Sequence, residues 1–301
     1  MVVVVERMVL AEVASNVARG LVREFADDGR TAGRFGREID RFVERALVEG
    51  AEFVDEVTVE VVAGFCDEAV RGRDGSWRAP AASTRRTRRA AVRWLFRRFR
   101  QEGICVVDPT VDVRVVEAPA GGPRPLTDAE VAECRLMSDR TLSQTRLPAC
   151  WALAEATLTT GEMSRLVVAD LDLEAGTVAA PGLSRGPVTR TVPLTDWGIE
   201  ALVRRVAELV GEGGGASTPL VYRSGRSLNA GGAAAGQAIN RILTYGGLGD
   251  DPSATAKSVI AWRALKTFEQ TGRIEAAALL IGSSSLDATA RLIGLDWTVG
   301  P

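Results

Sequence analysis

The most concentrated chemistry in this sequence is a run of arginines in residues 83–100, which holds eight arginines and no acidic residue. On a helix, apolar side chains from Val92 to Phe99 form one stripe and the arginines line a neighbouring stripe. The arginines predicted to present their charge outward are Arg85, Arg86, Arg89, Arg93, Arg97 and Arg100. Like charges packed this closely repel one another, which favours an anionic partner such as the phosphate backbone of DNA. The alternative is a solvated face neutralised by Glu and Asp side chains of neighbouring helices.

Histidine is absent from the chain. Its absence removes the usual general base at neutral pH, every catalytic triad that needs an imidazole, and every mixed Cys/His zinc site. The four cysteines form no CxxC pair, which predicts buried thiols in a reducing compartment and no metal site. The glycine runs at 211–215 and 230–236 lack the sequence context of a phosphate-binding loop, so no nucleotide cofactor is expected.

Composition points to an ordinary globular protein, with 46% hydrophobic and 25% charged residues. The net charge of −2 argues against a uniformly basic nucleic-acid binder, although it leaves room for a local basic stripe. Residues 1–5 are apolar but too short for a signal core, and no stretch approaches the roughly 18 apolar residues of a membrane span. We therefore expect a cytoplasmic, nucleoid-associated protein with no membrane partner.

Two domains are predicted to position these residues. Helical patterns over 7–29, 34–49, 58–71 and 83–100 make residues 1–106 a small all-helical bundle. Residues 107–124 are rich in proline and glycine and show no helical period, which indicates an interdomain linker.

Residues 125–301 form the predicted second domain, which opens with a capping box of Thr127 and Glu130 at a helix start. A helix near 148–165 is followed by strands at 177–180 and 189–194, joined by a hairpin-like connection. From residue 196 the pattern is helical again, with glycine-rich loops at 211–216 and 230–236. The predicted fold class is therefore mainly α, with a small antiparallel β-sheet in the second domain.

Four short segments, taken in order, resemble the phage-integrase or tyrosine-recombinase family. Residues 158–172 (LTTGEMSRLVVADLD) are similar to the family segment L-R-I-S-E-L … L-x-x-x-D-I-D, and residues 190–194 (RTVPL) to R-x-V-P-L. Residues 261–272 (AWRALKTFEQTG) resemble L-R-H-T-F … G, and residues 280–289 (LIGSSSLDAT) resemble L-G-H-S-S-I … T. The resemblance implies a helical, SAM-like core-binding domain joined to a recombinase catalytic-type domain, with double-stranded DNA clamped between them.

When the family's catalytic residues are matched one by one to this sequence, most of them fall on residues of a different type. The first catalytic arginine falls on Thr159, and the histidine of the H-x-x-R pair falls on Ile260. The later histidine falls on Ser283, and the nucleophilic tyrosine falls on Leu292. The hairpin lysine falls near residues 183–184, where no lysine stands. The resemblance therefore implies a catalytically degenerate member that lacks the nucleophilic tyrosine.

Some cationic positions of the family are retained in the second domain. Arg263 matches the arginine of the H-x-x-R pair, and the resemblance places it at the phosphate-facing centre of this domain. Arg185 and Arg190 belong to the hairpin region and are expected to contact DNA nearby.

The leading hypothesis is a non-catalytic double-stranded DNA-binding protein with an architectural or regulatory role and no enzyme activity. A second hypothesis is a protein-interaction subunit of a recombinase or mobile-element complex. A third is an active site-specific recombinase that uses a displaced nucleophile such as Tyr245. The protein partners left open are a second copy of the chain and an active recombinase.

Overall fold

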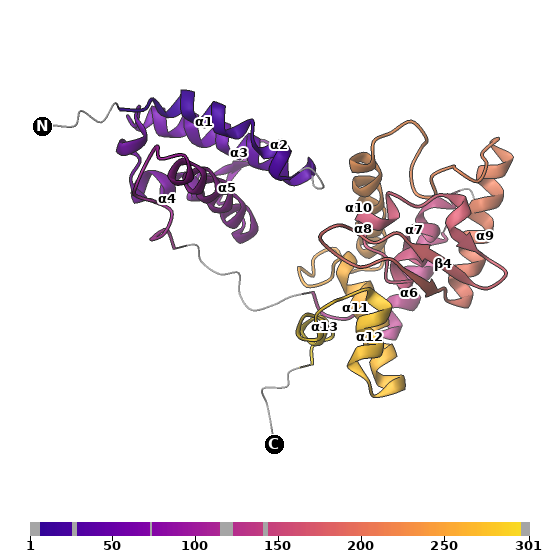
Figure 1. Cartoon of the computed structure of the whole chain (residues 1–301). Coiled ribbons are helices and arrows are strands. Elements are labelled where there is room, and N and C mark those ends of the chain that lie inside the picture. The colour runs from indigo at the N-terminus through magenta and orange to yellow at the C-terminus, as the bar shows by residue number, and fades with distance from the viewer. Residues whose placement is uncertain (1–6, 26–28, 73, 115–122, 141–143, 296–301) are drawn as a thin grey trace, which may run out of the picture. The chain divides into compact units, whose positions relative to one another are not determined.

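A computed structural model describes residues 7–25, 29–72, 74–114, 123–140 and 144–295. The chain divides into two compact units, residues 1–120 and 121–301, and each unit has its own hydrophobic core (Figure 1). Part of the predicted linker belongs to the first unit, since Thr110 and Val113 are buried there.

The first unit is helical, as predicted, with one small hairpin that was not. Its elements are α1 (Leu10–Ala18), α2 (Leu21–Glu24), α3 (Gly29–Val48), a 3-10 turn (Val54–Glu56), α4 (Val59–Asp67), β1 (Val70–Arg71), β2 (Trp77–Arg78) and α5 (Ala82–Gln101). In Figure 1, α1 and α3 run side by side and α5 packs beneath α3. Edge-to-face contacts of Phe42 with Phe65 and Phe96 join α3, α4 and α5 at the centre.

The helix boundaries near the N-terminus differ from the prediction. The predicted helix 7–29 breaks at Gly20, and α3 begins at Gly29 and continues through residues 30–33, which separated the first two predicted helices. A Cβ atom at Gly36 would lie 3.9 Å from Cδ1 of Leu21 in α2, which is an ordinary van der Waals contact. The helix therefore continues through this glycine, although a glycine inside a helix costs about 1 kcal/mol.

The end of α4 depends on a buried arginine of α5. The predicted helix 58–71 stops at Asp67, and Arg88, which has no exposed surface, donates from Nη1 to the carbonyl oxygens of Phe65 (3.1 Å) and Cys66 (3.3 Å). The last carbonyl groups of a helix have no partner within it, so this guanidinium replaces the missing hydrogen bonds. The chain then turns into the β1–β2 hairpin, in which Arg71 pairs with Trp77.

We expect Arg88→Ala to lower the free energy of unfolding by about 3 kcal/mol, because it leaves buried carbonyl groups unpaired and a hollow beneath them. The neighbouring exposed Arg86→Ala is the matched control and should change it by less than about 0.5 kcal/mol. Urea denaturation followed by circular dichroism measures both. Equal small effects would show that Arg88 does not hold the end of α4.

The second unit is mostly helical and carries a three-stranded antiparallel sheet, which confirms the predicted fold class. Its elements are α6 (Asp128–Ser138), α7 (Arg146–Glu155), α8 (Thr160–Met163), a 3-10 turn (Val168–Asp170), β3 (Leu171–Asp172), β4 (Thr177–Ala180), β5 (Arg190–Pro193), α9 (Asp196–Gly211), α10 (Leu228–Tyr245), α11 (Ala256–Thr271), α12 (Ile274–Ile281) and α13 (Leu286–Ile293). Helix α7 is buried from Leu147 to Glu155, with Trp151 at its centre. The predicted capping box of Thr127 and Glu130 is present at the start of α6.

The sequence misplaced two features of this unit. The predicted helix 148–165 divides into α7 and α8, because Thr157 between them has a left-handed φ of +64°. The predicted glycine loop at 230–236 lies inside α10. At Gly231 a Cβ atom would come within 2.7 Å of the Tyr222 ring, so the glycine lets the helix pack directly on that tyrosine.

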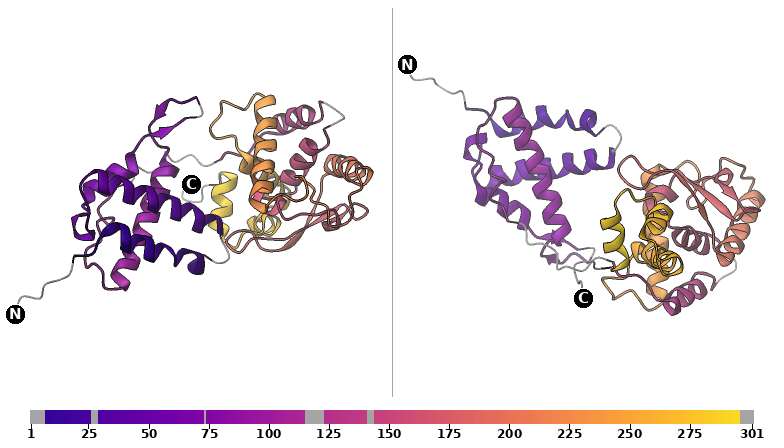
Figure 2. Two further views of the ribbon diagram at one scale, coloured as in Figure 1. Left: turned by 90° about the horizontal axis from the view of Figure 1, so that it is seen from above. Right: turned by 60° about the horizontal axis from the view of Figure 1, so that its bottom comes forward.

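The last three helices form a small core of their own, in which Ile260 of α11, Ile281 of α12 and Ile293 of α13 are buried together. Figure 2 shows these helices, in yellow, packed side by side. Among the described residues, no single helix is long and apolar enough to cross a membrane, and only the α12–α13 pair, bent by 94°, reaches that length and composition.

Candidate functional site

A cavity of about 460 Å³ opens in the second unit where four segments meet. These segments are the turn between α7 and α8, the loop between β4 and β5, the first half of α11, and the junction of α12 and α13. Its lining includes all four positions onto which the resemblance placed catalytic residues of the family, namely Thr159, Ile260, Ser283 and Leu292. Residues separated by up to 133 positions in the sequence (159 to 292) are thus brought to one place.

Thr159 is held at the cavity by the strained turn that precedes it. Its hydroxyl accepts a hydrogen bond from the backbone N–H of Glu162 (3.3 Å) and thereby caps α8. Thr157 lies on the wall of the cavity in the left-handed conformation, which a β-branched residue rarely adopts. Its own hydroxyl donates to the carbonyl oxygen of Leu280 (2.9 Å). Strain of this kind persists only where surrounding contacts enforce it, and it is typical of functional sites.

Arg190, predicted to contact DNA, is part of the framework behind the cavity. Its side chain is 8% exposed, and Nη1 forms an ion pair with the fully buried Glu162 at 2.6 Å. Nε donates to the carbonyl oxygen of Leu280 (2.8 Å) and Nη2 to that of Thr157 (3.1 Å). Its donors are bound to α8, to the end of α12 and to the turn between α7 and α8, so its contact with DNA stays a prediction.

Removing one member of this buried pair should be costly. We expect Arg190→Met to lower the free energy of unfolding by about 3–5 kcal/mol, since it strands the Glu162 carboxylate, and Glu162→Met to be costly because it strands the Arg190 guanidinium. The double variant Arg190→Met/Glu162→Met should lose less than the sum of the two single losses, because neither charge is then buried alone. Thermal unfolding measures the cycle, with the exposed Arg165→Ala as control. A double variant that loses the full sum of the two single losses would contradict a direct coupling.

Arg263, whose contact with phosphate stays a prediction, lies beside an internal ion pair. It is absent from the cavity lining, and its half-buried side chain faces Glu155 and Arg135. Burial lowers the pKa of Arg263, and its Nε has no hydrogen-bond partner among the described residues. Glu155 is fully buried and already accepts two hydrogen bonds of 2.7 Å from Arg135. The structure thus places the retained arginine beside an internal ion pair and not at the centre of the cavity.

Lys257 is the one cationic residue that lines the cavity, among the residues the structure describes. Sequence analysis did not single it out, although it precedes Ile260 by one helical turn and so shares the face of α11 that carries that position. The β4–β5 loop contributes Gly186 and Pro187, while Leu183, near the expected hairpin lysine, packs against Gly161. Arg185 is exposed on the same loop.

The lining groups limit the chemistry that the cavity can perform. Apart from Lys257, the polar side chains are hydroxyls, including those of Ser283, Ser284 and Ser285. The described lining contains no tyrosine, cysteine or arginine. Elsewhere in this unit, the thiol of Cys150 is fully buried, and burial raises its pKa to about 12. The cavity can donate hydrogen bonds and contribute one positive charge, but the part of its lining that the structure describes offers no phenol or thiolate nucleophile.

The arginine row of α5 is only partly outward-facing. Arg85 pairs with Asp67 (2.8 Å), Arg97 with Glu24 and Arg100 with the buried Asp108 (3.0 Å). Arg89 donates weakly to the carbonyl oxygen of Thr110 (3.4 Å). The alternative, neutralisation by neighbouring acidic residues, therefore holds for three of these arginines. The fourth, Arg89, is hydrogen-bonded to the loop that follows α5.

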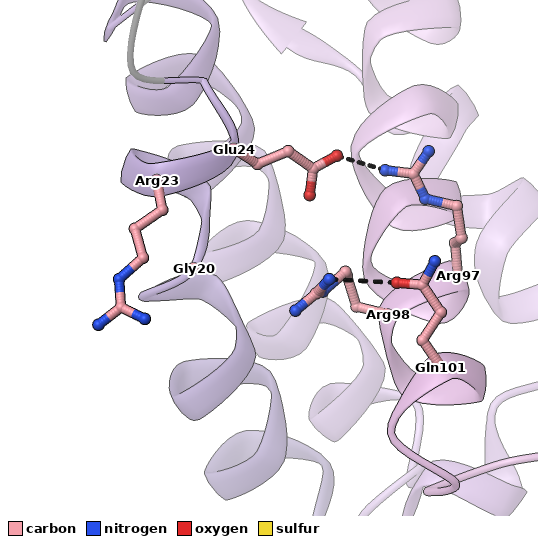
Figure 3. Close-up of a pocket in the computed structure, with 6 residues that line it drawn as sticks. All are labelled: Gly20, Arg23, Glu24, Arg97, Arg98 and Gln101. Atoms are coloured by element: carbon pink, nitrogen blue, oxygen red, sulfur yellow. Dashed lines mark hydrogen bonds and ion pairs between the residues drawn. The ribbon is translucent and has the colours of Figure 1, made fainter.

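A hollow of about 530 Å³ between α2 and α5 shows the same neutralisation. In Figure 3, the Glu24 carboxylate reaches Arg97, Arg98 reaches Gln101, and Arg23 points away from both pairs. The positive charges that line this hollow on α5 are thus already engaged.

Two arginines of the row remain outward-facing. Arg86 and Arg93 are exposed and form no ion pair within the described ranges. They are seven residues apart, which places them on one face of α5 about 10 Å from each other along the helix axis.

Tyr245, the candidate displaced nucleophile, lies at the end of α10 between two arginines. The guanidinium of Arg140 stacks 3.8 Å from the centre of its ring, and Nε of Arg241 donates to its hydroxyl oxygen. The hydrogen bond and the nearby positive charges lower the pKa of Tyr245. Gly236, which contacts Thr160, is nine residues earlier in the helix, so Tyr245 lies about 14 Å along the axis from that contact.

Comparison with known proteins gives a fold but no sequence relative. No protein-family model matches the chain, and no curated protein matches it with significant similarity. A solved structure of a lambda integrase dimer bound to a COC′ core site matches with a TM-score of 0.70 at 16% identity, over 97% of this chain and 79% of that one. A lambda integrase (75–356) dimer bound to a COC′ core site has a TM-score of 0.66 at 15% identity, over 98% of both chains.

A third similar structure is the Tn1549 transposon integrase in complex with a circular intermediate DNA, with a TM-score of 0.61 at 14% identity over 95% of both chains. At these identities the likeness concerns the fold. The chain therefore has the fold of integrases, the proteins to which its four motifs pointed.

Proposed function

We propose that this protein binds double-stranded DNA with an integrase-like pair of domains and does not cut it. One observation carries the proposal: the four replaced catalytic positions line a single cavity, and none of them bears the group that strand cleavage requires. We expect it to have an architectural or regulatory role at the nucleoid. Its protein partner there would be a second copy of the chain or an active recombinase.

Strand cleavage by a tyrosine enzyme needs a phenolic oxygen in line with the phosphorus, positive charge on the non-bridging oxygens and an acid for the leaving oxygen. Leu292 supplies no nucleophile, Thr159 no charge and Ile260 no proton. Arg190 cannot stand in for the missing arginine while its donors are bound to Glu162 and to backbone carbonyls. Among the described lining residues, Lys257 alone carries a charge that attracts a phosphate.

Support for DNA binding comes from exposed arginines. Arg86 and Arg93 share one face of α5, about 10 Å apart along the helix axis, and the exposed Arg185 of the β4–β5 loop is expected to add a contact from the second unit. Both faces can be tested separately, since they belong to different units.

The test is a salt-dependent titration of duplex DNA with the full chain. We expect Arg86→Gln/Arg93→Gln to weaken binding and to reduce the log–log salt slope by about 2, since each lost phosphate contact removes about 0.9. The matched control is Arg34→Gln/Arg37→Gln, which removes the same charge from exposed positions of α3 and should leave the slope unchanged. Affinity and slope unaltered in the α5 variant would refute this face as a DNA contact.

One observation favours a second candidate, a strand transferase with a displaced nucleophile. The lowered pKa of Tyr245 and the two flanking guanidinium groups are what an activated phenol needs. Its position outside the cavity counts against it, and Tyr245→Phe tests it directly.

A further inference from the structure

The β1–β2 hairpin exposes a tryptophan that the first unit does not use. Trp77 is 70% exposed, and Val48 of α3 is 83% exposed. Between them lies a hollow of about 320 Å³, bounded by Val48, Glu44 and Arg45 of α3 on one side and by Trp77 on the other. The hollow has a mixed lining, with Val48 and Ala69 beside charged side chains of α3 and Glu68. A protruding tryptophan, which is apolar but carries an N–H donor, is typical of an anchor residue in a protein–protein interface.

Two exposed residues of opposite charge lie beside the hollow, one on the β1–β2 hairpin and one on α3. In the hairpin register Arg71 stands directly opposite Trp77, so both side chains project from the same face of the ribbon. Glu44 lies on the facing wall of α3. Both Arg71 and Glu44 are exposed, and neither forms an ion pair within the described part of the chain.

The remaining charges at this surface already neutralise one another. Arg41 pairs with Glu68 (2.8 Å), and Arg45 pairs with Glu49 of its own helix. Arg78 of the hairpin pairs with Asp74 (2.5 Å). The α3 wall therefore offers carboxylates and satisfied guanidinium groups, which does not favour DNA phosphates on this face.

We propose that this surface binds a second copy of the same chain about a two-fold axis. In such an interface the same patch occurs on both partners, so each Trp77 fills the hollow of the other and each Arg71 meets the other Glu44. The exposed Trp77, the hollow, and the charges of Arg71 and Glu44 all find partners in this arrangement. A partner that matched only one of these features would leave the others exposed to solvent. The interface is independent of the proposed DNA contacts on α5.

Sedimentation of the full chain without DNA tests the first part of this proposal. A concentration-dependent dimer is expected, and Trp77→Ala should weaken it by at least about tenfold, as for a central aromatic anchor. Val22→Ala, at a 71% exposed position of α2 outside the patch, is the control and should leave dimerisation unchanged. A chain that stays monomeric at every concentration, or a dimer indifferent to Trp77→Ala, overturns the proposal.

A charge swap tests the pairing itself and does not depend on the tryptophan. Arg71→Glu and Glu44→Arg should each weaken the dimer, because each places like charges opposite one another. The double variant should restore it, since the ion pair re-forms with reversed sign. Both positions are exposed, so the fold tolerates the changes. A double variant no better than the two single variants overturns the assigned contact.

Discussion

No covalent protein–DNA adduct should form on a nicked suicide duplex, and Leu292→Tyr should not create one. The restored phenol would enter a cavity that still lacks the positive charge of position 159 and the proton donors of positions 260 and 283. The loss of one electrostatic donor costs on the order of 3 kcal/mol, about a hundredfold in rate, and several missing together leave no measurable cleavage.

Denaturing electrophoresis of labelled duplex measures this outcome. Leu292 packs against the small core of α11, α12 and α13, so the variant's fold must be verified by circular dichroism before its inactivity is interpreted. A shifted band from the unmodified chain would contradict the non-catalytic function. If Tyr245→Phe then abolished that band, the displaced nucleophile would be identified.

Separating the two units should weaken DNA binding by at least about a hundredfold. When two binding modules are joined, the second binds at an effective concentration set by the connection, which raises the overall affinity by about 10²–10⁴ over either alone. Each unit has its own core, so residues 1–120 and 121–301 are suitable fragments. Titration of each fragment, and of the two mixed in trans, measures the effect. A fragment 1–120 that binds as tightly as the full chain rules out the clamp.

The sequence located the site better than it assigned the roles of single arginines. The positions Thr159, Ile260, Ser283 and Leu292 were identified from motif spacing and meet in one cavity, because the order of helices and strands determines where those motifs lie. The capping box of Thr127 was also predictable, since both of its members lie within four residues.

The roles of individual arginines depended on partners distant in the sequence. Arg190 finds Glu162 28 residues away and Arg97 finds Glu24 73 residues away, and no local pattern predicts such pairs. Glycines caused the other errors. The glycines of residues 230–236 suggested a loop, whereas Gly231 lies inside α10 and lets the helix pack closely against Tyr222.

One mixture of the full chain with labelled duplex DNA, divided between a native gel and a denaturing gel, separates binding from cutting. Binding without cleavage predicts a shifted complex on the native gel that weakens as salt rises, and only intact free DNA on the denaturing gel. A duplex that does not shift at low salt, or a shifted or shortened strand that survives denaturation, would contradict the proposed function.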